Sequence, residues 1–413
     1  MADHILEEDV FPIVGWAGPG GEMIRDEVMA GMAEAGFTVS HSRPGKSIDE
    51  VLRALDVAAA HGVRLLLVHP AYHVENDFKL TANRKKQIKR IVETVRDHPG
   101  LYGYHLRDEP HFDLLPMLGK VAAYCESLDP YHLIYINHFP PIRGWGAPTV
   151  EWFWREYIRL IRPGVLSYDH YCVTVGSGQE IEEGRDKPNV FPAHKIIVKP
   201  DFFEALDVVR TFACANGLPF WPFTCSVRHG AYPTPTEGHI RFQLFNALAY
   251  GARGLQYFTY AHDQAMVRPD GSTTGTREIA RRVNAEIHTL APVLRRLTST
   301  GVFHNGRLWD GTRRLPAGGE HLAVDVKGDQ VTVGNFIDAS GVHYVMVVNT
   351  NPCDWSRITL EVNVEDEKLY CFDPRDGKAR ELWPVNPRAQ LVALAPGEGR
   401  LFQLGGQGEG KNF

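Results

Sequence analysis

Positions 103–110 read Gly103-Tyr104-His105-Leu106-Arg107-Asp108-Glu109-Pro110, an apolar run that leads into two adjacent carboxylates and a proline. Extended back to residue 101, the run has the period-two alternation of a β-strand. Pro110 lacks a backbone N–H and disfavours helix at the preceding residue, so Glu109 is expected where a strand meets a loop. Asp108 and Glu109 would then lie at the carboxyl end of a strand, where α/β barrels carry their chemistry. The alternative is a pair of loop carboxylates, or a helix cap, without a catalytic role.

Two patterns alternate on both sides of this strand. Apolar, β-rich segments predict further strands at residues 11–17, 37–42, 63–69, 132–137, 165–171, 219–226 and 254–260. Amphipathic segments predict helices at residues 23–35, 48–61, 82–96, 114–127, 149–161, 202–215, 239–249 and 278–297. These strand–helix repeats predict an α/β fold, a (β/α)8 TIM barrel. The alternative is an open doubly wound sheet, but Gly18-Pro19-Gly20-Gly21 after the first strand lacks the G-x-G-x-x-G form.

The pattern changes after about residue 301. Short alternating segments separated by turn residues predict strands at 322–326, 330–336, 344–349, 358–364, 368–372, 389–393 and 400–404. Gly328-Asp329 and Asp376-Gly377 are hairpin-type turn signals. We therefore expect a catalytic barrel over residues 1–300, a C-terminal all-β sandwich over 301–405, and a frayed Gly-rich tail over 406–413.

Composition excludes several classes of protein. The 413 residues are 44% hydrophobic and 23% charged, with a formal net charge of −6, so no basic surface for nucleic acid or anionic membrane is expected. No apolar run approaches the roughly 20 residues of a membrane helix. The N-terminal sequence shows no signal peptide, which favours a cytoplasmic location, although a mature secreted chain would look the same. Six scattered cysteines without a Cys-x-x-Cys pair favour neither a disulfide framework nor structural zinc.

The ends of the predicted strands carry many carboxylates, imidazoles and aromatic rings. Aromatic rings stack on sugar faces, and carboxylates and amides bind hydroxyls, so this set predicts a carbohydrate pocket without a cofactor. The residues expected to bind the sugar are Trp16, His69, Tyr72, Asn137, His138, Tyr171, Arg228, Tyr260 and Asp263. Trp145 and Trp221 are further candidates for a stacking platform, with a place in the core as the alternative for each tryptophan.

The chain resembles the (β/α)8 glycoside hydrolases of the large retaining clan, which includes β-galactosidases and many β-glycanases. The resemblance rests on Asp108-Glu109-Pro110, on residues 247–258 around the eighth strand, and on Val347-Val348-Asn349 and Phe372-Asp373-Pro374 in the C-terminal segment. It implies a glycosidase in which Glu109 is the general acid that protonates the leaving oxygen, and Asp108 orients or hydrogen-bonds.

One position departs from the pattern of that clan. Retaining members carry a nucleophilic glutamate at the end of strand seven, but this chain has Phe223-Thr224-Cys225-Ser226-Val227-Arg228 there. Glycoside hydrolysis normally requires a second carboxylate. Asp169, at the end of strand six, is the first candidate, followed by Glu237 and then Asp263. Glu237 is also interpretable as the start of a helix, because Thr236 precedes it and an acid there favours the helix dipole.

Other mechanisms stay open at this stage. Tyr168-Asp169 and Asp108-Glu109 are similar to chitinase-like and hexosaminidase-like barrels, which use the substrate's acetamido group as nucleophile, although the spaced acidic motif of chitinases is absent. His105, His138, His170 and His262 could converge on a metal, but no His-x-His follows the first strand, so we predict no metal. A non-catalytic carbohydrate-binding barrel is the remaining alternative. The sugar, the linkage and the oligomeric state are not indicated.

Overall fold

The computed structural model describes residues 10–176, 189–309, 311–316, 324–362, 368–382 and 389–405. The chain groups into two compact units. The first runs from the N-terminus to His170 and adds residues 211–227 and 254–281. The second consists of residues 171–210, 228–253 and 282 onward. The predicted boundary near residue 300 stays a prediction, and the predicted tail 406–413 lies outside the described residues.

Eight parallel strands form the sheet of the first unit, in the order β5-β4-β3-β2-β1-β11-β10-β6. They are β1 (Ile13–Gly15), β2 (Val39–Ser42), β3 (Arg64–Leu67), β4 (Leu101–Asp108), β5 (Leu133–Asn137), β6 (Leu166–Tyr168), β10 (Phe220–Cys225) and β11 (Leu255–Phe258). A parallel bridge between His138 and Tyr168 joins the two ends of this order and closes the sheet into a barrel. The predicted TIM barrel is confirmed, and the doubly wound alternative is wrong.

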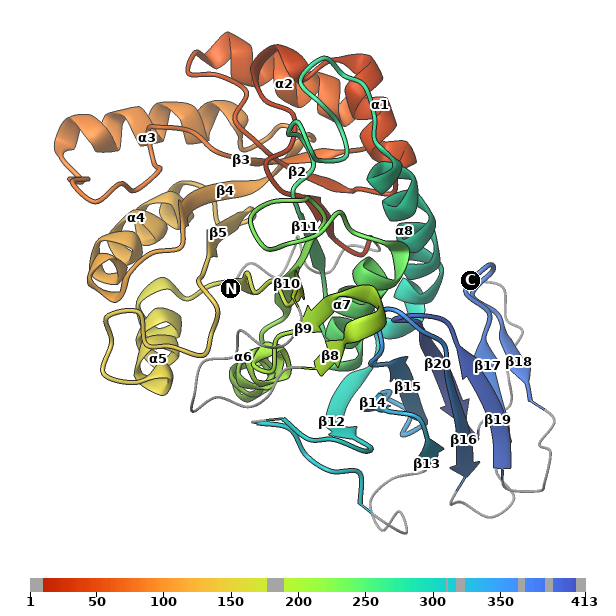
Figure 1. Cartoon of the computed structure of the whole chain (residues 1–413). Helices are drawn as coiled ribbons and strands as arrows, with labels where there is room; N and C mark the ends of the chain where they lie inside the picture. The colour runs from red at the N-terminus through yellow and green to blue at the C-terminus, as the bar shows by residue number, and fades with distance from the viewer. Residues whose placement is uncertain are drawn as a thin grey trace. The chain divides into compact units, whose positions relative to one another are not determined.

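The described helices are α1 (Asp26–Glu34), α2 (Ile48–Ala60), α3 (Ala82–Val95), α4 (Leu115–Leu128) and α5 (Val150–Ile161), followed by α6 (Phe202–Asn216), α7 (Glu237–Ala249) and α8 (Gly275–Leu294). Helices α1 to α5 lie outside the strands of the first unit, and capping residues mark where two of them begin (Figure 1). Ser47 and Glu50 form a capping box at α2, and Thr149 caps α5 by accepting from the Trp152 N–H. Short 3-10 turns occur at Gly21–Met23, Phe112–Leu114 and Pro192–His194.

The second unit contains the antiparallel sheets. A six-stranded sheet has the order β12-β14-β15-β20-β17-β18, and three-stranded sheets have the orders β13-β16-β19 and β7-β9-β8. The strands are β7 (Val173–Val175), β8 (Asn189–Phe191), β9 (Ile196–Val198), β12 (Thr298–His304), β13 (Val324–Gly328), β14 (Val331–Ile337), β15 (His343–Asn349), β16 (Ser356–Val362), β17 (Leu369–Phe372), β18 (Ala379–Glu381), β19 (Ala389–Leu394) and β20 (Gly399–Leu404).

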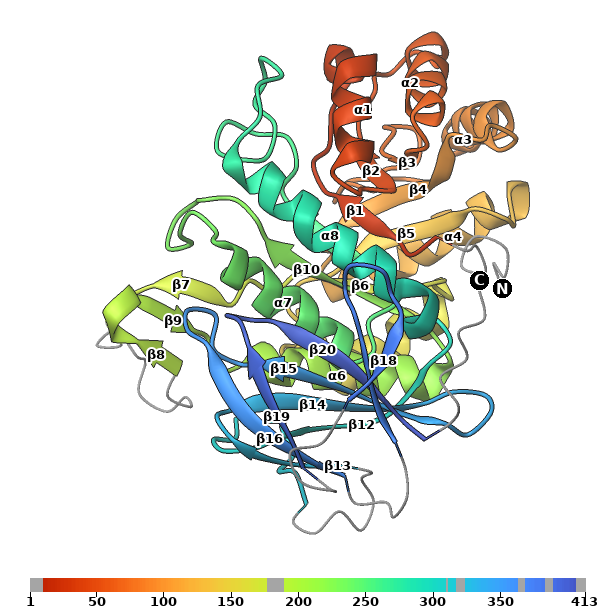
Figure 2. The same cartoon turned by 90° about the vertical axis from the view of Figure 1, so that its right-hand side faces the viewer.

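The C-terminal strands form a sandwich. Val333, Val347 and Phe402 of the six-stranded sheet share a buried cluster with Ile358 and Val392 of the β13-β16-β19 sheet. Figure 2 shows β16 and β19 as a layer facing β14, β15 and β20. The predicted all-β sandwich is therefore confirmed, since alternating side chains of both sheets meet in one core.

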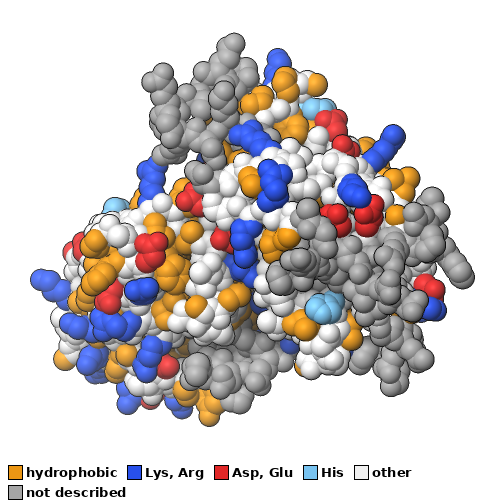
Figure 3. All heavy atoms as spheres, turned by 90° about the horizontal axis from the view of Figure 1, so that it is seen from below, with side chains coloured by type: hydrophobic (Ala, Val, Ile, Leu, Met, Phe, Trp, Pro, Cys, Tyr) orange, Lys and Arg blue, Asp and Glu red, His pale blue; other side chains and the backbone are white. Residues whose placement is uncertain are grey.

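The described surface mixes charges of both signs. On the face in Figure 3, Lys and Arg side chains are interspersed with Asp, Glu and hydrophobic side chains. Within the described part of the chain, none of the helices has the length and apolar character needed to cross a membrane.

Candidate active site

β4 carries two carboxylates to the barrel mouth. Asp108 ends β4 and pairs with Asn137, the last residue of β5. The Glu109 backbone N–H donates to the Asn137 carbonyl (2.9 Å), and Glu109 has a φ of 46°. Non-glycine residues seldom adopt this left-handed conformation, and it occurs preferentially at functional sites. The turn holds both carboxylates at the carboxyl ends of the strands.

Asp169 joins this pair from β6. Its backbone N–H donates to the His138 carbonyl (3.0 Å). Its side chain hydrogen-bonds the Glu109 side chain, and its Oδ1 is buried without a hydrogen-bond partner among the described residues. Because two carboxyl groups can hydrogen-bond only if one of them is protonated, Glu109 and Asp169 share a proton.

Burial raises the pKa of all three carboxyl groups at this edge. The pKa of Asp169 lies well above its ordinary value because of burial, then because of the charges on Glu109 and Asp108. Burial and the Asp108 charge raise the pKa of Glu109, and its hydrogen bond with Asp169 partly opposes this rise. The two groups therefore titrate as a pair, which keeps one proton to higher pH than an isolated carboxyl group would.

A buried hydrogen-bond network supports Asp108. Asn137 Nδ2 donates to Asp108 Oδ1 (3.0 Å), and Ser167 Oγ donates to Asn137 Oδ1 (2.8 Å). Gln256 Nε2 donates to Ser167 Oγ (2.8 Å), and the Tyr135 hydroxyl donates to Gln256 Oε1 (2.5 Å). Side chains from β5, β6 and β11 thus hold a carboxylate that β4 provides.

A cavity of about 450 Å³ opens beside these carboxylates. It is lined by Asn76, Arg107, Asp108, Glu109, His111, Asp113, Leu114 and Phe139. Arg107 is held by Glu75 (2.6 Å) and Asn76 (3.2 Å). The Phe139 ring stacks on Trp145 with centroids 4.1 Å apart, so an aromatic wall stands beside the acids.

A buried aromatic layer fills the barrel near the same strands. Trp16 stacks on His41 with centroids 3.6 Å apart, and His41 Nε2 lies 3.0 Å from His105 Nδ1. Burial holds the pKa of both imidazoles well below the ordinary value, so both rings are neutral. Trp16 is thus buried against the barrel interior, and Trp221 is fully buried.

Several residues expected to bind sugar lie elsewhere in the first unit. His69 bonds the Lys46 carbonyl (3.2 Å), and the Tyr72 hydroxyl donates to the Leu67 carbonyl (2.9 Å). His138 packs against the Tyr157 ring of α5, with centroids 4.1 Å apart. Tyr260 is buried against Phe37, with centroids 5.1 Å apart. None of these four predicted residues lines the cavity beside Glu109.

The remaining predicted residues are also accounted for. Glu237 begins α7 and bonds Arg241 (2.9 Å) and Arg282 (2.8 Å), which lower its pKa although burial works against them. Tyr171 packs against His229 and Tyr232 in the second unit. Arg228 and Asp263 are exposed. Asn137, Asp108, Glu109 and Asp169 are the predicted residues that the structure brings together.

The end of β10 carries hydroxyl side chains instead of the glutamate that the resemblance implied. Thr224 Oγ1 and Ser226 Oγ are buried and have no hydrogen-bond partner among the described residues. Buried polar atoms are usually paired, so unpaired ones at strand ends are typical of a site that receives a ligand. Among the described residues, no three His, Cys, Asp or Glu side chains are grouped as a metal site requires.

Sequence reasoning missed several residues of this site. Arg107 was visible beside the carboxylates, and Phe139 lies two residues after the end of the fifth strand, so their positions were available signals. Asn76 and His111 lie in loops, and His41 lies within β2. For those three residues we find no local sequence signal.

Comparisons with known proteins support the fold. No family model matches the chain, and no curated protein matches its sequence. A structure described as a glycoside hydrolase has a TM-score of 0.61 at 12% identity, covering 96% of this chain and 93% of that one. A family 5 glycoside hydrolase from Bacteroides vulgatus has a TM-score of 0.58 at 12% identity, covering 97% and 90%.

A third similar structure is a β-galactosidase from the psychrophilic Marinomonas ef1, with a TM-score of 0.52 at 13% identity. The match covers 71% of this chain, which spans 63% of that β-galactosidase. At these identities the likeness shows the fold alone. The chain therefore has the barrel architecture found in glycoside hydrolases.

Proposed function

We propose that this protein is a glycoside hydrolase that cleaves a glycosidic bond in an oligo- or polysaccharide, with Glu109 as general acid and Asp169 as the second carboxyl group. The observation that carries the proposal is the Glu109–Asp169 pair at the barrel mouth, whose carboxyl groups interact. The backbone N–H groups of the two acids donate to the consecutive carbonyls of Asn137 and His138. Glycoside hydrolysis requires two carboxyl groups in opposite protonation states, and a pair that shares one proton supplies them.

The division of roles follows from which carboxyl faces the cavity. Glu109 lines the cavity, so it is placed to protonate a leaving oxygen, and Asp169 is not among the lining residues. With the shared proton on Glu109, Asp169 is the carboxylate that hydrolysis requires. A hydrogen-bonded pair is closer to the roughly 5–5.5 Å separation of retaining enzymes than to the roughly 6.5–9.5 Å of inverting ones. We therefore expect retention of configuration.

A carbohydrate-binding barrel without catalysis is the second candidate. The observation that favours it is the end of β10, where Thr224, Cys225 and Ser226 stand instead of a carboxylate. Such a protein would bind an oligosaccharide without hydrolysing it.

The test is hydrolysis of natural oligosaccharides and of activated aryl glycosides, N-acetylated sugars included, by wild type, Glu109→Gln and Asp169→Asn. We expect the hydrolytic activity of Glu109→Gln to fall about a hundredfold or more on natural substrates. On activated aryl glycosides it should fall much less, because a good leaving group needs no acid. Asp169→Asn should lose activity on both classes of substrate, and added azide should restore part of that activity. Glu237→Gln is the matched control, and it should keep activity wherever it stays folded.

Three results would contradict the proposal. Equal activity of wild type and Glu109→Gln on natural substrates would show that Glu109 is not the general acid. If the variants lose activity on N-acetylated sugars alone, and Asp169 is indispensable for that activity, the substrate-assisted mechanism would be favoured instead. Saccharide binding without hydrolysis of any substrate would favour the binding barrel.

A further inference from the structure

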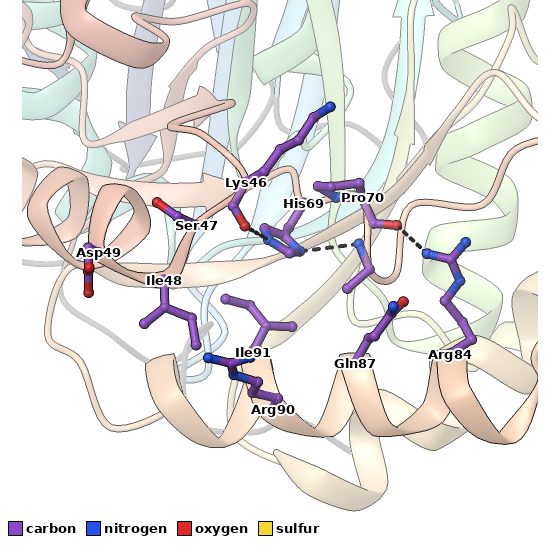
Figure 4. A pocket seen from close by; sticks show the side chains of 11 residues that line it. Lys46, Ser47, Ile48, Asp49, His69, Pro70, Arg84, Gln87, Arg90 and Ile91 are labelled. Carbon is purple, nitrogen blue, oxygen red and sulfur yellow. Dashed lines mark hydrogen bonds between the residues drawn. The ribbon is translucent and has the colours of Figure 1, made fainter.

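A second cavity, of about 610 Å³, lies between α3 and the loop after β3 (Figure 4). Its charged lining is mainly basic, with Lys46, Arg84 and Arg90 against a single acid, Asp49. Arg84, Gln87 and Arg90 are three residues apart and therefore share a face of α3. In Figure 4 Arg84 and Gln87 extend from α3 toward the loop that begins at His69, the Arg90 side chain runs along α3, and Asp49 stands at the end of the cavity opposite Arg84.

The cations of this cavity have no carboxylate partners in the part of the chain that the structure describes. Within the described ranges, Lys46, Arg84 and Arg90 form no ion pair. Arg84 is nevertheless held in place, since its Nη1 donates to the Pro70 carbonyl (3.0 Å) and its guanidinium lies 5.0 Å from the centre of the Phe78 ring. A fixed guanidinium with unused donors is preorganised for a planar oxyanion.

The charge pattern of α3 strengthens the positive potential at the cavity. The first turn of α3 holds no acidic residue and includes Arg84, so this cation lies at the positive end of the helix dipole. Lys85, Lys86 and Lys89 follow on the same helix. Like charges at such spacings destabilise a helix, and a bound anion would offset that cost.

A third cavity, of about 690 Å³, adjoins the basic cavity. This third cavity shares Pro70, Arg84 and Gln87 with the basic cavity and is also lined by Glu75. Glu75 bonds Arg107 (2.6 Å), which lines the cavity of Glu109. The basic cavity and the third cavity therefore share lining residues, and the Glu75–Arg107 ion pair lies between the third cavity and the cavity of Glu109. A saccharide that extended from Glu109 to Arg90 would pass this ion pair.

We propose that the basic cavity binds an acidic group, a carboxylate or a sulfate ester, on a sugar unit away from the scissile bond, so that the substrate is an anionic saccharide. This inference rests on the proposed hydrolase function, because it names the substrate class of the same site. Arg84 and Arg90 are the residues that would determine this specificity.

The test is calorimetric binding to intact Glu109→Gln protein, in which turnover is blocked. The probes are oligogalacturonates against their methyl esters, sulfated galactan oligosaccharides against their desulfated forms, and sodium sulfate. We expect at least one anionic oligosaccharide to bind about tenfold or more tightly than its neutral form, with an affinity that falls as salt is raised. The double variant Arg84→Gln/Arg90→Gln should abolish this preference and leave neutral binding unchanged. The matched control Lys86→Gln/Lys89→Gln removes the same charge from α3 outside the cavity and should keep the preference.

Equal binding of anionic and neutral forms would overturn the inference, as would an equal loss of preference in both double variants. Sodium sulfate binding as tightly as the oligosaccharides would also overturn it, because the cavity would then hold an isolated oxyanion. If wild type hydrolyses neutral glycosides through Glu109 without any anionic preference, the anionic specificity is wrong and the proposed hydrolase function is supported. If anionic saccharides bind through Arg84 and Arg90 but none is hydrolysed, the anionic specificity is supported and the proposed hydrolase function is contradicted.

Discussion

Asp108 adds, through its charge, to the rise that burial causes in the pKa of both acids of the pair. Its carboxylate raises the pKa of both Glu109 and Asp169, so it keeps the shared proton in place to higher pH. Activity that needs this proton should be present below the raised pKa of the pair and lost above it. Asp108→Asn removes the charge and can still accept the bond from Asn137, so the alkaline limb of kcat/KM should move to lower pH. A pH–rate profile checks this, and an unmoved alkaline limb would show that the limb belongs to another group.

Asp169 reduces stability at neutral pH. Its pKa is raised on folding, so the folded protein is favoured when the group is protonated, and this advantage is lost as pH rises and the unfolded chain ionises. Asp169→Asn should therefore raise the free energy of unfolding by about 1 kcal/mol at neutral pH, a typical gain when a strained active-site residue is replaced. The gain should vanish below about pH 4, where Asp169 is protonated in both states. Urea denaturation at both pH values measures it, and a gain that persists at low pH would assign it to packing instead.

The placement of single residues was only partly predictable. Glu109, Asp108, Asp169 and Asn137 were predicted at strand ends, and the structure brings them together. His138 follows Asn137 directly but packs against α5, because consecutive side chains of a strand point to opposite faces. The sequence indicates which residues end a strand. It does not indicate which of two neighbours points into the barrel when both are polar.

At the scale of elements, β4 depends on close approach to β5. Gly103 pairs with Leu133, and a Cβ at Gly103 would collide with the Leu133 carbonyl oxygen. Gly103→Ala should push the strands apart and lower the free energy of unfolding by about 1–3 kcal/mol, the usual cost of overpacking. Because Asp108 and Glu109 end the same strand, kcat should fall as well. Thermal denaturation and kinetics measure both effects, with Gly62→Ala, where a Cβ meets no atom but φ is positive, as the control for backbone strain alone.

Elements with strong local signals were predicted well. The Ser47 capping box precedes α2, and Thr236 caps the start of α7 as its sequence indicated. β12, β18 and the β7-β9-β8 sheet were missed. Thr298–His304 mixes Thr, Ser and Gly without clear alternation, and its pairing with β14 is a tertiary contact that local propensity does not report.

Acid should destabilise the whole molecule through its buried histidines. Burial lowers the pKa of His138 and of His304 to about 3, and His41 and His105 are also shifted well below the ordinary value. Below about pH 6.5 these histidines bind protons in the unfolded chain, whereas the buried rings stay neutral in the folded protein. The free energy of unfolding therefore falls by about 1.4 kcal/mol per pH unit for each ring. His138→Leu should reduce the slope by about that amount between roughly pH 6 and pH 4. The exposed His343→Gln should not, and urea denaturation across this range compares the two.

The network around Asp108 also has a consequence for synthesis on the ribosome. Tyr135 and Gln256 are 121 residues apart in sequence, yet their hydrogen bond belongs to the support of Asn137 and Asp108. β1 likewise stays without its β11 neighbour until Leu255 is available for pairing with Ile13. A nascent chain that has just exposed Glu109 and Asp169 therefore carries both acids without their scaffold. The site is assembled late in translation, when the strand that contains Gln256 has emerged.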